Sequence, residues 1–575
     1  MRKSFWFVVA FVLLIRLPFL NQAIQGDDVY YLAAAEHAQI DPAHPHHAKY
    51  VFLGMPIDMR GHPHPPGDAW ILAALLAALG DIHEVPFHAA YIAFSLLAAW
   101  AMWRLAARFT PDRQLESTLL FCAVPAFIVN GNSLEADLPF LAFWMAGFAA
   151  FIERRLVLAA LALAAASLIA YQGIVAIPIL AVYLWLYRRD DRASWLVLLS
   201  PAIAIAAYQL SERLSSGAIP VQVLSGHLET MQLQTLTMKL KNAVALTGHL
   251  AMMMSPLGLF VIRPRRQPFL AAWMAIFFAA ALVLFFAGSA RYLLPLAAPF
   301  ALLVASRWWT CFALQTVLGL SLAWVNYQHW DGYRAFPKPA DARVWVNAEW
   351  GLRFYSEAQG ALPLVRGQNI RPGDLLITSE LAGQIPYTTA GGQAVLEREM
   401  PIKPALPLRL IGHGSGSGYS SVAFGLWPFG WSMQPVDTVR LYRIVPRNPT
   451  LSWLPMNAPE AESQIVSGVF GLEQGQWRWA SGSASFLLKS PPQPSKLAAD
   501  FYLPDVAPGR KLTLSLDGKT VAELTVPTPG RYRIESPPVL GTMVTLAIDK
   551  EFQPAGDNRR LGMIISAIGF VPEGR

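Results

Sequence analysis

The sequence predicts a polytopic α-helical membrane domain followed by a water-soluble region that contains a small α/β domain and a β-sandwich or jelly-roll domain. Of the 575 residues, 54% are hydrophobic and only 14% are charged, which is typical of polytopic membrane proteins. The apolar residues fill the chain from Phe5 to about Val325, whereas the remaining chain is rich in Pro, Gly and Ser. We therefore expect domains at residues 1–326, 327–446 and 447–575.

Composition argues against a cysteine-based scaffold and against a nucleic-acid-binding protein. Both cysteines, Cys122 and Cys311, lie inside apolar runs, so the sequence offers neither a disulfide framework nor a cysteine-based metal site. The net charge of +7 comes largely from arginines in short clusters between hydrophobic segments. We interpret the basic balance as a signal of membrane topology, not of binding to nucleic acid.

The first hydrophobic segment, Phe5 to Leu20, follows Arg2 and Lys3 and lacks a small-residue cleavage site. This pattern predicts an uncleaved first helix that begins in the cytoplasm. Further hydrophobic runs are expected at about 68–80, 85–107, 115–130, 138–152, 156–170, 171–187, 194–210, 243–262, 268–287, 290–306 and 308–325.

The run at 68–80 decides the topology. Thirteen residues at a rise of 1.5 Å cover about 20 Å, which is short of the roughly 30 Å hydrocarbon core, so this helix should lie on the surface or re-enter. Without it, the arginines at 104–113, 154–155, 188–192, 263–266 and 307 share the side of the N-terminus, as the positive-inside rule requires. We expect eleven spans in the cytoplasmic (inner) membrane, with the C-terminal tail outside.

Two adjacent carboxylates follow the first span, in the stretch Gly26 to Tyr31. A carboxylate at the end of a spanning helix can reach water, whereas at the bilayer centre it would cost about 2.5–3.5 kcal/mol. Asp27 and Asp28 are therefore candidates for catalysis, with Tyr30 and Tyr31 lining the substrate. The alternative is that one aspartate caps the following helix.

A second acidic motif, Glu135-Ala136-Asp137, is expected on the same outer face. Residues two apart on a helix point about 200° from each other, so both carboxylates serve one site only if the helix begins at or after Asp137. Pro139 favours that start. The pair could bind the acceptor or a metal. Alternatively, Asp137 is a cap and Glu135 is solvated.

The loop from Arg60 to Gly67 presents histidines between prolines, which keep it from becoming helical. His62 and His64 would face the same way on an extended segment and could bind a metal or a phosphate oxygen. The alternative is a proline-shaped turn whose histidines are merely polar. A weaker metal signal comes from His44, His46 and His47.

Arg291 lies at the outer mouth of a late span, where its planar fork would suit a phosphate. The alternative is an interfacial anchor. Arg16, near the outer end of the first helix, has the same two interpretations. Tyr171 and Gln172 offer hydrogen-bonding groups at another outer boundary, either to line the substrate or to pack helices.

Together these motifs resemble the GT-C superfamily of membrane glycosyltransferases, in the bacterial branch related to protein O-mannosyltransferases and to the aminoarabinose transferase of lipid A. The resemblance covers about residues 1–330. It implies inverting transfer of a sugar from a polyprenyl-phosphate donor to an acceptor on the outer face, with Asp27 as the catalytic base. The motifs that carry it are Asp27 to Tyr31, His64-Pro65-Pro66, Glu135 to Asp137, and Arg291 to Pro295.

The sequence departs from this branch at the residue before the two prolines. A lysine there helps to hold the donor phosphate, whereas this chain has His64, which is charged only if its pKa is raised. We therefore expect Arg291, Arg60 or Arg16 to contact the phosphate as well. No cofactor is required by the sequence, although a divalent metal would be compatible with it.

The acceptor stays open among a lipid, a glycan and a protein. An alternative function is a transporter or flippase of lipid-linked sugars, which would not need Asp27 to remove a proton. Transporters often carry internal repeats, and none is visible here.

The tail begins with a strand, a helix and a strand at about 343–346, 350–360 and 362–365, which predicts the α/β domain. From Leu451 onward, short alternating runs are separated by turns such as Asp517-Gly518. This pattern predicts the antiparallel sandwich or jelly roll.

Overall fold

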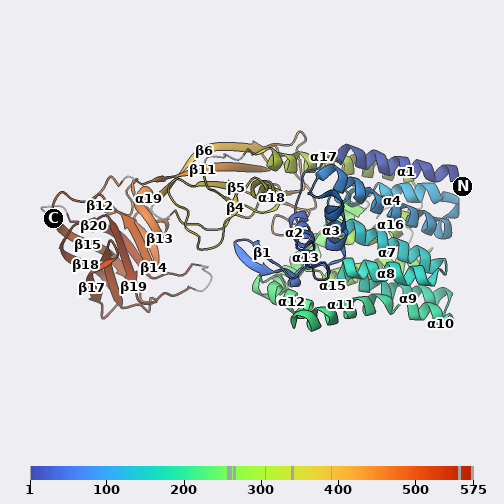
Figure 1. Ribbon diagram of the computed structural model, residues 1–575, viewed down its shortest axis with the longest axis horizontal. Helices are drawn as coiled ribbons and strands as arrows, with labels where there is room; N and C mark the ends of the chain where they lie inside the picture. Colours follow the sequence, from blue (N-terminus) through green and yellow to red (C-terminus); the bar gives the residue numbers. More distant parts are fainter. Residues whose placement is uncertain are drawn as a thin grey trace.

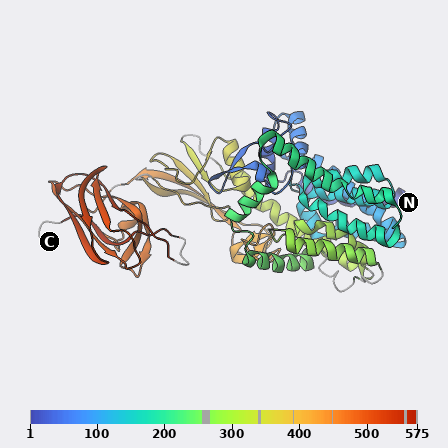
Figure 2. The ribbon, with the colours of Figure 1, turned by 90° about the horizontal axis from the view of Figure 1, so that it is seen from below.

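The computed structural model describes residues 2–254, 262, 267–304, 306–337, 342–389, 392–447, 449–554 and 559–571. Figure 1 shows an elongated molecule with a helical bundle at one end, a β-sheet region at the other, and a mixed α/β region between them. Figure 2 shows the same order from below. An apolar helical N-terminal region and a β-rich C-terminal region are thus confirmed, while the exact domain boundaries stay predictions.

The first part of the chain runs from the far end of the bundle toward the α/β region (Figure 1). Helix α1 (Arg2–Arg16) continues into a 3-10 turn at Leu17–Phe19 and is followed by α2 (Asp28–His37). A hairpin of β1 (Lys49–Phe52) and β2 (Met55–Asp58) precedes the turn η2 (Met59–Gly61) and α3 (Gly67–Leu79). Helix α3 has 13 residues, matching the short run predicted there.

Further helices complete the bundle. They are α4 (Glu84–Phe109), α5 (Gln114–Cys122), α6 (Pro125–Asn130), α7 (Asp137–Ile152), α8 (Leu156–Ile169), η4 (Tyr171–Val175), α9 (Ala176–Tyr187), α10 (Arg192–Val197), α11 (Ser200–Ser216), α12 (Pro220–Thr230), α13 (Leu236–His249), η5 (Leu250–Met254), α15 (Pro268–Leu284), η7 (Arg291–Leu296), α16 (Ala297–Leu303) and α17 (Trp308–Ala335). All but one of them overlap a predicted hydrophobic run; the exception is α12, which lies between the runs at 194–210 and 243–262.

Three stretches in the described part of the chain are long and apolar enough to cross a membrane: 84–109, 192–216 and 308–335. Other apolar helices have 10–17 residues, so the number of eleven spans stays a prediction. The N-terminus and α10 lie at the same far end of the bundle, which agrees with the predicted common side for their arginines (Figure 1). Two stretches of this region, 255–261 and 263–266, lie outside the described residues. They include part of the predicted run at 243–262 and the arginines at 263, 265 and 266.

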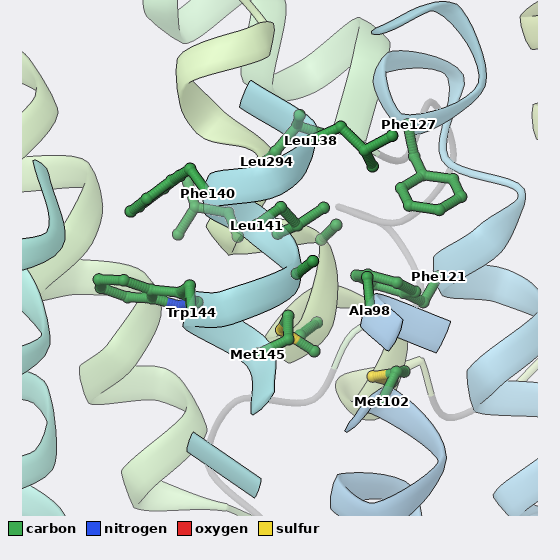
Figure 3. Close-up of a cluster of buried hydrophobic side chains, with 14 of the residues drawn as sticks. Ala98, Met102, Phe121, Phe127, Leu138, Phe140, Leu141, Trp144, Met145 and Leu294 are labelled. Atoms are coloured by element: carbon green, nitrogen blue, oxygen red, sulfur yellow. The ribbon is translucent and has the colours of Figure 1, made fainter. Parts of the chain in front are cut away.

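The bundle core is centred on α7, which is buried almost all round. Its side chains pack against Ala98 and Met102 of α4, against Phe121 of α5 and against Phe127 of α6 (Figure 3). A helix that is apolar on every face belongs in the interior of a bundle. The first residue of α7 is Asp137, so this packing fixes an acidic group at the end of the bundle that faces the α/β region.

The α/β region contains a five-stranded sheet of order β4-β3-β5-β11-β6. Strand β3 (Val344–Asn347), helix α18 (Trp350–Ala358) and β4 (Leu362–Pro363) match the predicted strand, helix and strand. Strand β5 (Leu375–Ser379) is parallel to β3, whereas β11 (Asp437–Pro446) is antiparallel to both β5 and β6 (Gly392–Ile402). Short pairs of strands connect β6 to β11: β7 (Leu408–Arg409) with β10 (Gly430–Trp431), and β8 (Ile411–Gly412) with β9 (Ser417–Gly418).

The C-terminal region differs from the expected sandwich, because hydrogen bonds join nine strands into one sheet. The sheet curls until β17 and β18, the two ends of its main strand order, contact each other. Alternating sequence patterns show which face is buried but not how many sheets form.

The predicted Asp517-Gly518 turn is present, with both residues at positive φ. The strands are β12 (Trp453–Pro455), β13 (Ile465–Glu473), β14 (Trp477–Leu487), β15 (Ser495–Leu503), β16 (Lys511–Leu516), β17 (Lys519–Thr525), β18 (Gly530–Val539), β19 (Met543–Ile548) and β20 (Met563–Phe570); a short helix, α19 (Ala461–Gln464), precedes β13.

Buried Asp437 joins the bundle to the α/β sheet. Its carboxylate accepts from the Tyr333 hydroxyl at 2.6 Å and from the Leu381 N–H at 3.0 Å. We expect Asp437→Ala to lower the free energy of unfolding by about 2–3 kcal/mol, because buried donors lose their acceptor. Thermal unfolding of the purified protein measures this, with exposed Asp505→Ala as the control. Equal transition temperatures for the two variants would contradict the structural role.

Candidate active site

Three carboxylates from two separate segments surround the guanidinium of Arg291. Its Nη2 donates to Asp27 Oδ2 at 3.0 Å, its Nη1 pairs with Glu135 Oε2, and its Nε lies 3.8 Å from Asp137 Oδ2. Tyr292 adds a hydroxyl that accepts from Nη2 at 3.1 Å. The structure therefore brings together both acidic motifs and the arginine that the sequence singled out.

Asp27 is the carboxylate of this group that faces open space. Its side chain is 38% exposed, compared with 8% for Glu135 and 4% for Asp137. Gly26 precedes it at φ +44°, and a Cβ there would lie 3.0 Å from Glu135 Oε1, so glycine allows the close approach. Asp27 is the N-cap residue of α2, yet its side chain makes no capping hydrogen bond. It remains available for another partner.

Asp28, in contrast, is fully buried. Its carboxylate accepts from Ser133 Oγ at 2.8 Å, from the Leu134 N–H at 2.9 Å and from the Gln25 N–H at 3.1 Å. Burial raises the pKa of Asp28 to about 7, although these hydrogen bonds oppose the shift. Asp28 lines neither cavity described below, and its hydrogen bonds fix the loop that carries Glu135.

Two cavities meet at Asp27 and Arg291. The first, which we call the His62 cavity, has a volume of about 290 Å³, and the second, the Trp350 cavity, about 690 Å³. The walls of the His62 cavity include Tyr30, Tyr31, Leu224, Leu228, Met238 and Phe286, whereas those of the Trp350 cavity include Gln25, Asn130, Ser133, Asn326, Trp330 and Glu349. One carboxylate and one guanidinium are therefore reachable from both sides.

The histidines of the proline-rich loop line the His62 cavity as neutral groups. Burial lowers the pKa of His62 to about 4 and also lowers that of His64. Phosphate binding would need a charged His64, whereas this environment favours the neutral form. In the described residues, neither histidine belongs to a group of three metal-ligand atoms within 4.8 Å of one another.

Arg60 and Arg16 lie outside both cavities. The Nε of Arg60 donates to the Asp58 carboxylate at 3.0 Å. Arg16 is buried in the bundle and donates to Ser95 Oγ at 3.0 Å and to two main-chain carbonyls of α6. A Cβ at Gly131 would lie 1.8 Å from the Arg16 Cζ atom, so only glycine fits beside this side chain. Arg16 thus supports the start of the loop that leads to Glu135.

Tyr171 and Gln172 pack helices together, which was the alternative to lining the substrate. The Tyr171 hydroxyl accepts from Gln209 Nε2 at 3.0 Å, which joins η4 to α11, and Gln172 is buried. Neither residue lines the two cavities.

The sequence did not reveal the residues that the tail adds to the site. Glu349 accepts from the Tyr30 hydroxyl at 3.4 Å and from the Leu53 N–H at 2.8 Å. Tyr419 donates to Asn130 Oδ1, and Asn130 Nδ2 donates to Asp137 Oδ2 at 3.3 Å. These residues lie far along the chain from the acidic motifs, and no local pattern marks them.

The structure is similar to that of ArnT from Cupriavidus metallidurans bound to undecaprenyl phosphate, with 16% identity, a TM-score of 0.31, and coverage of 65% of this chain and 93% of the other. It is also similar to the arabinofuranosyltransferase AftD from Mycobacteria, with 13% identity, a TM-score of 0.37, and coverage of 99% of this chain and 62% of the other. No protein-family model and no curated protein matches the chain.

Burial raises the pKa of Glu349 from its ordinary value of 4.5 to about 7. The folded protein therefore keeps this proton up to a higher pH than the unfolded chain does. The free energy of unfolding falls as the pH rises from about 4.5 through about 7. Glu349→Gln removes the titration. We expect the thermal stability of this variant, relative to that of the native protein, to rise over the same pH range and then to level off.

The control is Glu380→Gln, which changes an exposed carboxylate in the same region. A stability difference for Glu349→Gln that stays constant across this pH range would show that the Glu349 pKa is not raised.

Proposed function

We propose that this protein is an inverting glycosyltransferase that moves a sugar from a polyprenyl-phosphate donor to an acceptor on the outer face of the cytoplasmic membrane. One observation carries the proposal: the partly exposed Asp27 carboxylate faces Arg291 at the meeting point of two cavities. This arrangement suits a transferase, because the donor and the acceptor must meet at one point and the base must reach the acceptor there.

The His62 cavity suits the donor. A polyprenyl phosphate combines an aliphatic chain with a phosphate, and this cavity combines aliphatic and aromatic walls with the Arg291 guanidinium. Arginine binds phosphate oxygens through paired, charge-assisted hydrogen bonds. Because Arg291 already faces three carboxylates, we infer that the phosphate replaces Asp27 on Nη2 instead of adding to the existing contacts. Donor binding would then free Asp27.

The Trp350 cavity suits the acceptor, which is a lipid, a glycan or a protein. In the proposed step, Asp27 takes the proton of an acceptor hydroxyl or amide, and the acceptor atom forms a bond to the anomeric carbon. The bond between that carbon and the phosphate oxygen breaks on the opposite face, so configuration inverts. Polyprenyl phosphate leaves with the bonding electrons, and Arg291 stabilises its charge. General-base catalysis of this kind contributes about 10²–10⁴ in rate.

With this function, the tail and both cavities would lie on the outer side of the membrane, and the arginine-rich loops would lie in the cytoplasm. The alternative function is a transporter of lipid-linked sugars, and the transfer assay described next distinguishes the two. A transporter would move the donor without forming a glycosylated product.

Asp27→Asn keeps an oxygen that accepts from Arg291 but removes the base. We expect sugar transfer from polyprenyl phosphate by purified protein to fall about 10²–10⁴-fold, with donor binding retained. Asp81→Asn, at an exposed residue outside both cavities, is the matched control and should transfer normally. Transfer at the native rate by Asp27→Asn would refute the base assignment.

Arg291→Lys keeps the positive charge but removes the planar fork. Losing one charge-assisted hydrogen bond, worth about 1.5–3 kcal/mol, should raise the KM for the donor at least about tenfold. The control is Arg108→Lys, at an exposed residue of α4 far from the cavities. An unchanged donor KM in Arg291→Lys would mean that the phosphate binds elsewhere.

A further inference from the structure

The segment between α2 and β1 carries a cluster of metal-binding side chains that the proposed reaction does not use. Asp41, His44 and His47 each offer one ligand atom, and these three atoms lie within 4.8 Å of one another. Among the described residues, this is the one such group of three. None of the three lines either cavity.

The backbone of this segment sets the spacing of the three side chains. Two consecutive turns are closed by hydrogen bonds, from the His44 N–H to the Asp41 carbonyl at 3.2 Å and from the His47 N–H to the His44 carbonyl at 3.0 Å. Side chains three residues apart in such turns lie one above the other. Pro42 and Pro45 occupy the second position of the two turns, where proline pre-sets φ. The geometry is therefore prepared before any ligand binds.

Two of the ligand atoms already lie close enough to share a small metal ion, because His44 Nδ1 lies 3.0 Å from Asp41 Oδ2. The rings of His44 and His47 stack with centroids 4.4 Å apart and planes 12° from parallel. Because a ring nitrogen binds a metal in the plane of its own ring, one of the two rings must turn before both histidines bind one ion. Ligands of a tetrahedral zinc ion, with bonds of about 2.0–2.1 Å, lie about 3.3 Å from each other. Replacing the Asp41–His44 hydrogen bond by two metal bonds thus needs a small separation of these two side chains, together with the rotation of one imidazole ring.

A fourth residue orients one of the ligands. His47 Nε2 lies 2.6 Å from Glu212 Oε2 of α11, and the Glu212 side chain is only 4% exposed. Metal-binding histidines commonly donate their second ring N–H to a carboxylate, which fixes the tautomer and raises the basicity of the other nitrogen. Glu212 would hold His47 Nδ1 toward the ion in this way.

We propose that Asp41, His44 and His47 bind one divalent transition-metal ion of the zinc type, with Glu212 as a positioning residue. Two imidazoles and one carboxylate are ligands that Zn²⁺ favours, and a water would complete the tetrahedron. The ion would hold the segment before β1 in its two turns, and the contact between His47 and Glu212 joins that segment to α11. Phe52 of β1 and Ile57 of β2 line the His62 cavity, so the site would brace one wall of that cavity.

The test measures zinc in the purified full-length protein in detergent, after removal of metal by a chelator and back-titration with Zn²⁺ alone. The native protein should bind one equivalent more than His44→Gln/His47→Gln. Replacing zinc by Co²⁺ should give the visible absorption of a tetrahedral site in the native protein only. His83→Gln, at an exposed histidine outside the cluster, is the control and should match the native protein.

Glu212→Gln tests the positioning role separately, because it leaves all three ligands in place. We expect it to weaken zinc binding about 10–100-fold while the stoichiometry stays the same. Equal zinc stoichiometry in the native protein and in the correctly folded double variant, as judged by gel filtration, would overturn the proposal. Should the double variant not fold, Asp41→Asn with unchanged zinc affinity and unchanged Co²⁺ absorption would overturn it as well. Neither readout depends on glycosyl transfer.

Discussion

The candidate site depends on the neutralisation of one buried arginine by several carboxylates. Arg291 is almost fully buried, and a charge in that position is tolerable only with charged partners close by. Asp27, Glu135 and Asp137 provide them from the start of α2 and the start of α7. Each of these segments must then be held precisely, which explains the contacts of their neighbours. Asp28 fixes the 133–134 backbone, and Arg16 fixes the end of α6.

Much of the helical region could be predicted from the sequence, because burial in a bundle and insertion in a membrane both leave long apolar runs. The short helix at 67–79 and the start of α7 at Asp137 followed from length and from proline placement. The number of sheets in the C-terminal region could not be predicted. Alternation reports one buried face, and a single curled sheet produces the same pattern as two stacked sheets.

The site was predictable only where its residues stand beside a hydrophobic segment. Asp27, Glu135, Asp137 and Arg291 are polar residues at helix ends, so each was visible against an apolar background. Asp28 has the same local appearance, and only its hydrogen bonds to Ser133 and Leu134 distinguish it from its neighbour. Glu349 and Tyr419 lie in a region where polar residues are ordinary, and tertiary contacts alone reveal their place.

The participation of Tyr419 also orders events during synthesis of the protein. The acidic motifs leave the ribosome early, whereas the segment that reaches Asn130 from above the bundle emerges almost 300 residues later. Until that segment docks, through Tyr419 and the hydrogen bond from Ser289 to its carbonyl, Asn130 lacks the Tyr419 hydroxyl as a partner and the Trp350 cavity lacks one wall. A nascent chain with all its apolar helices in place thus still has an unfinished site, and the C-terminal tail completes it.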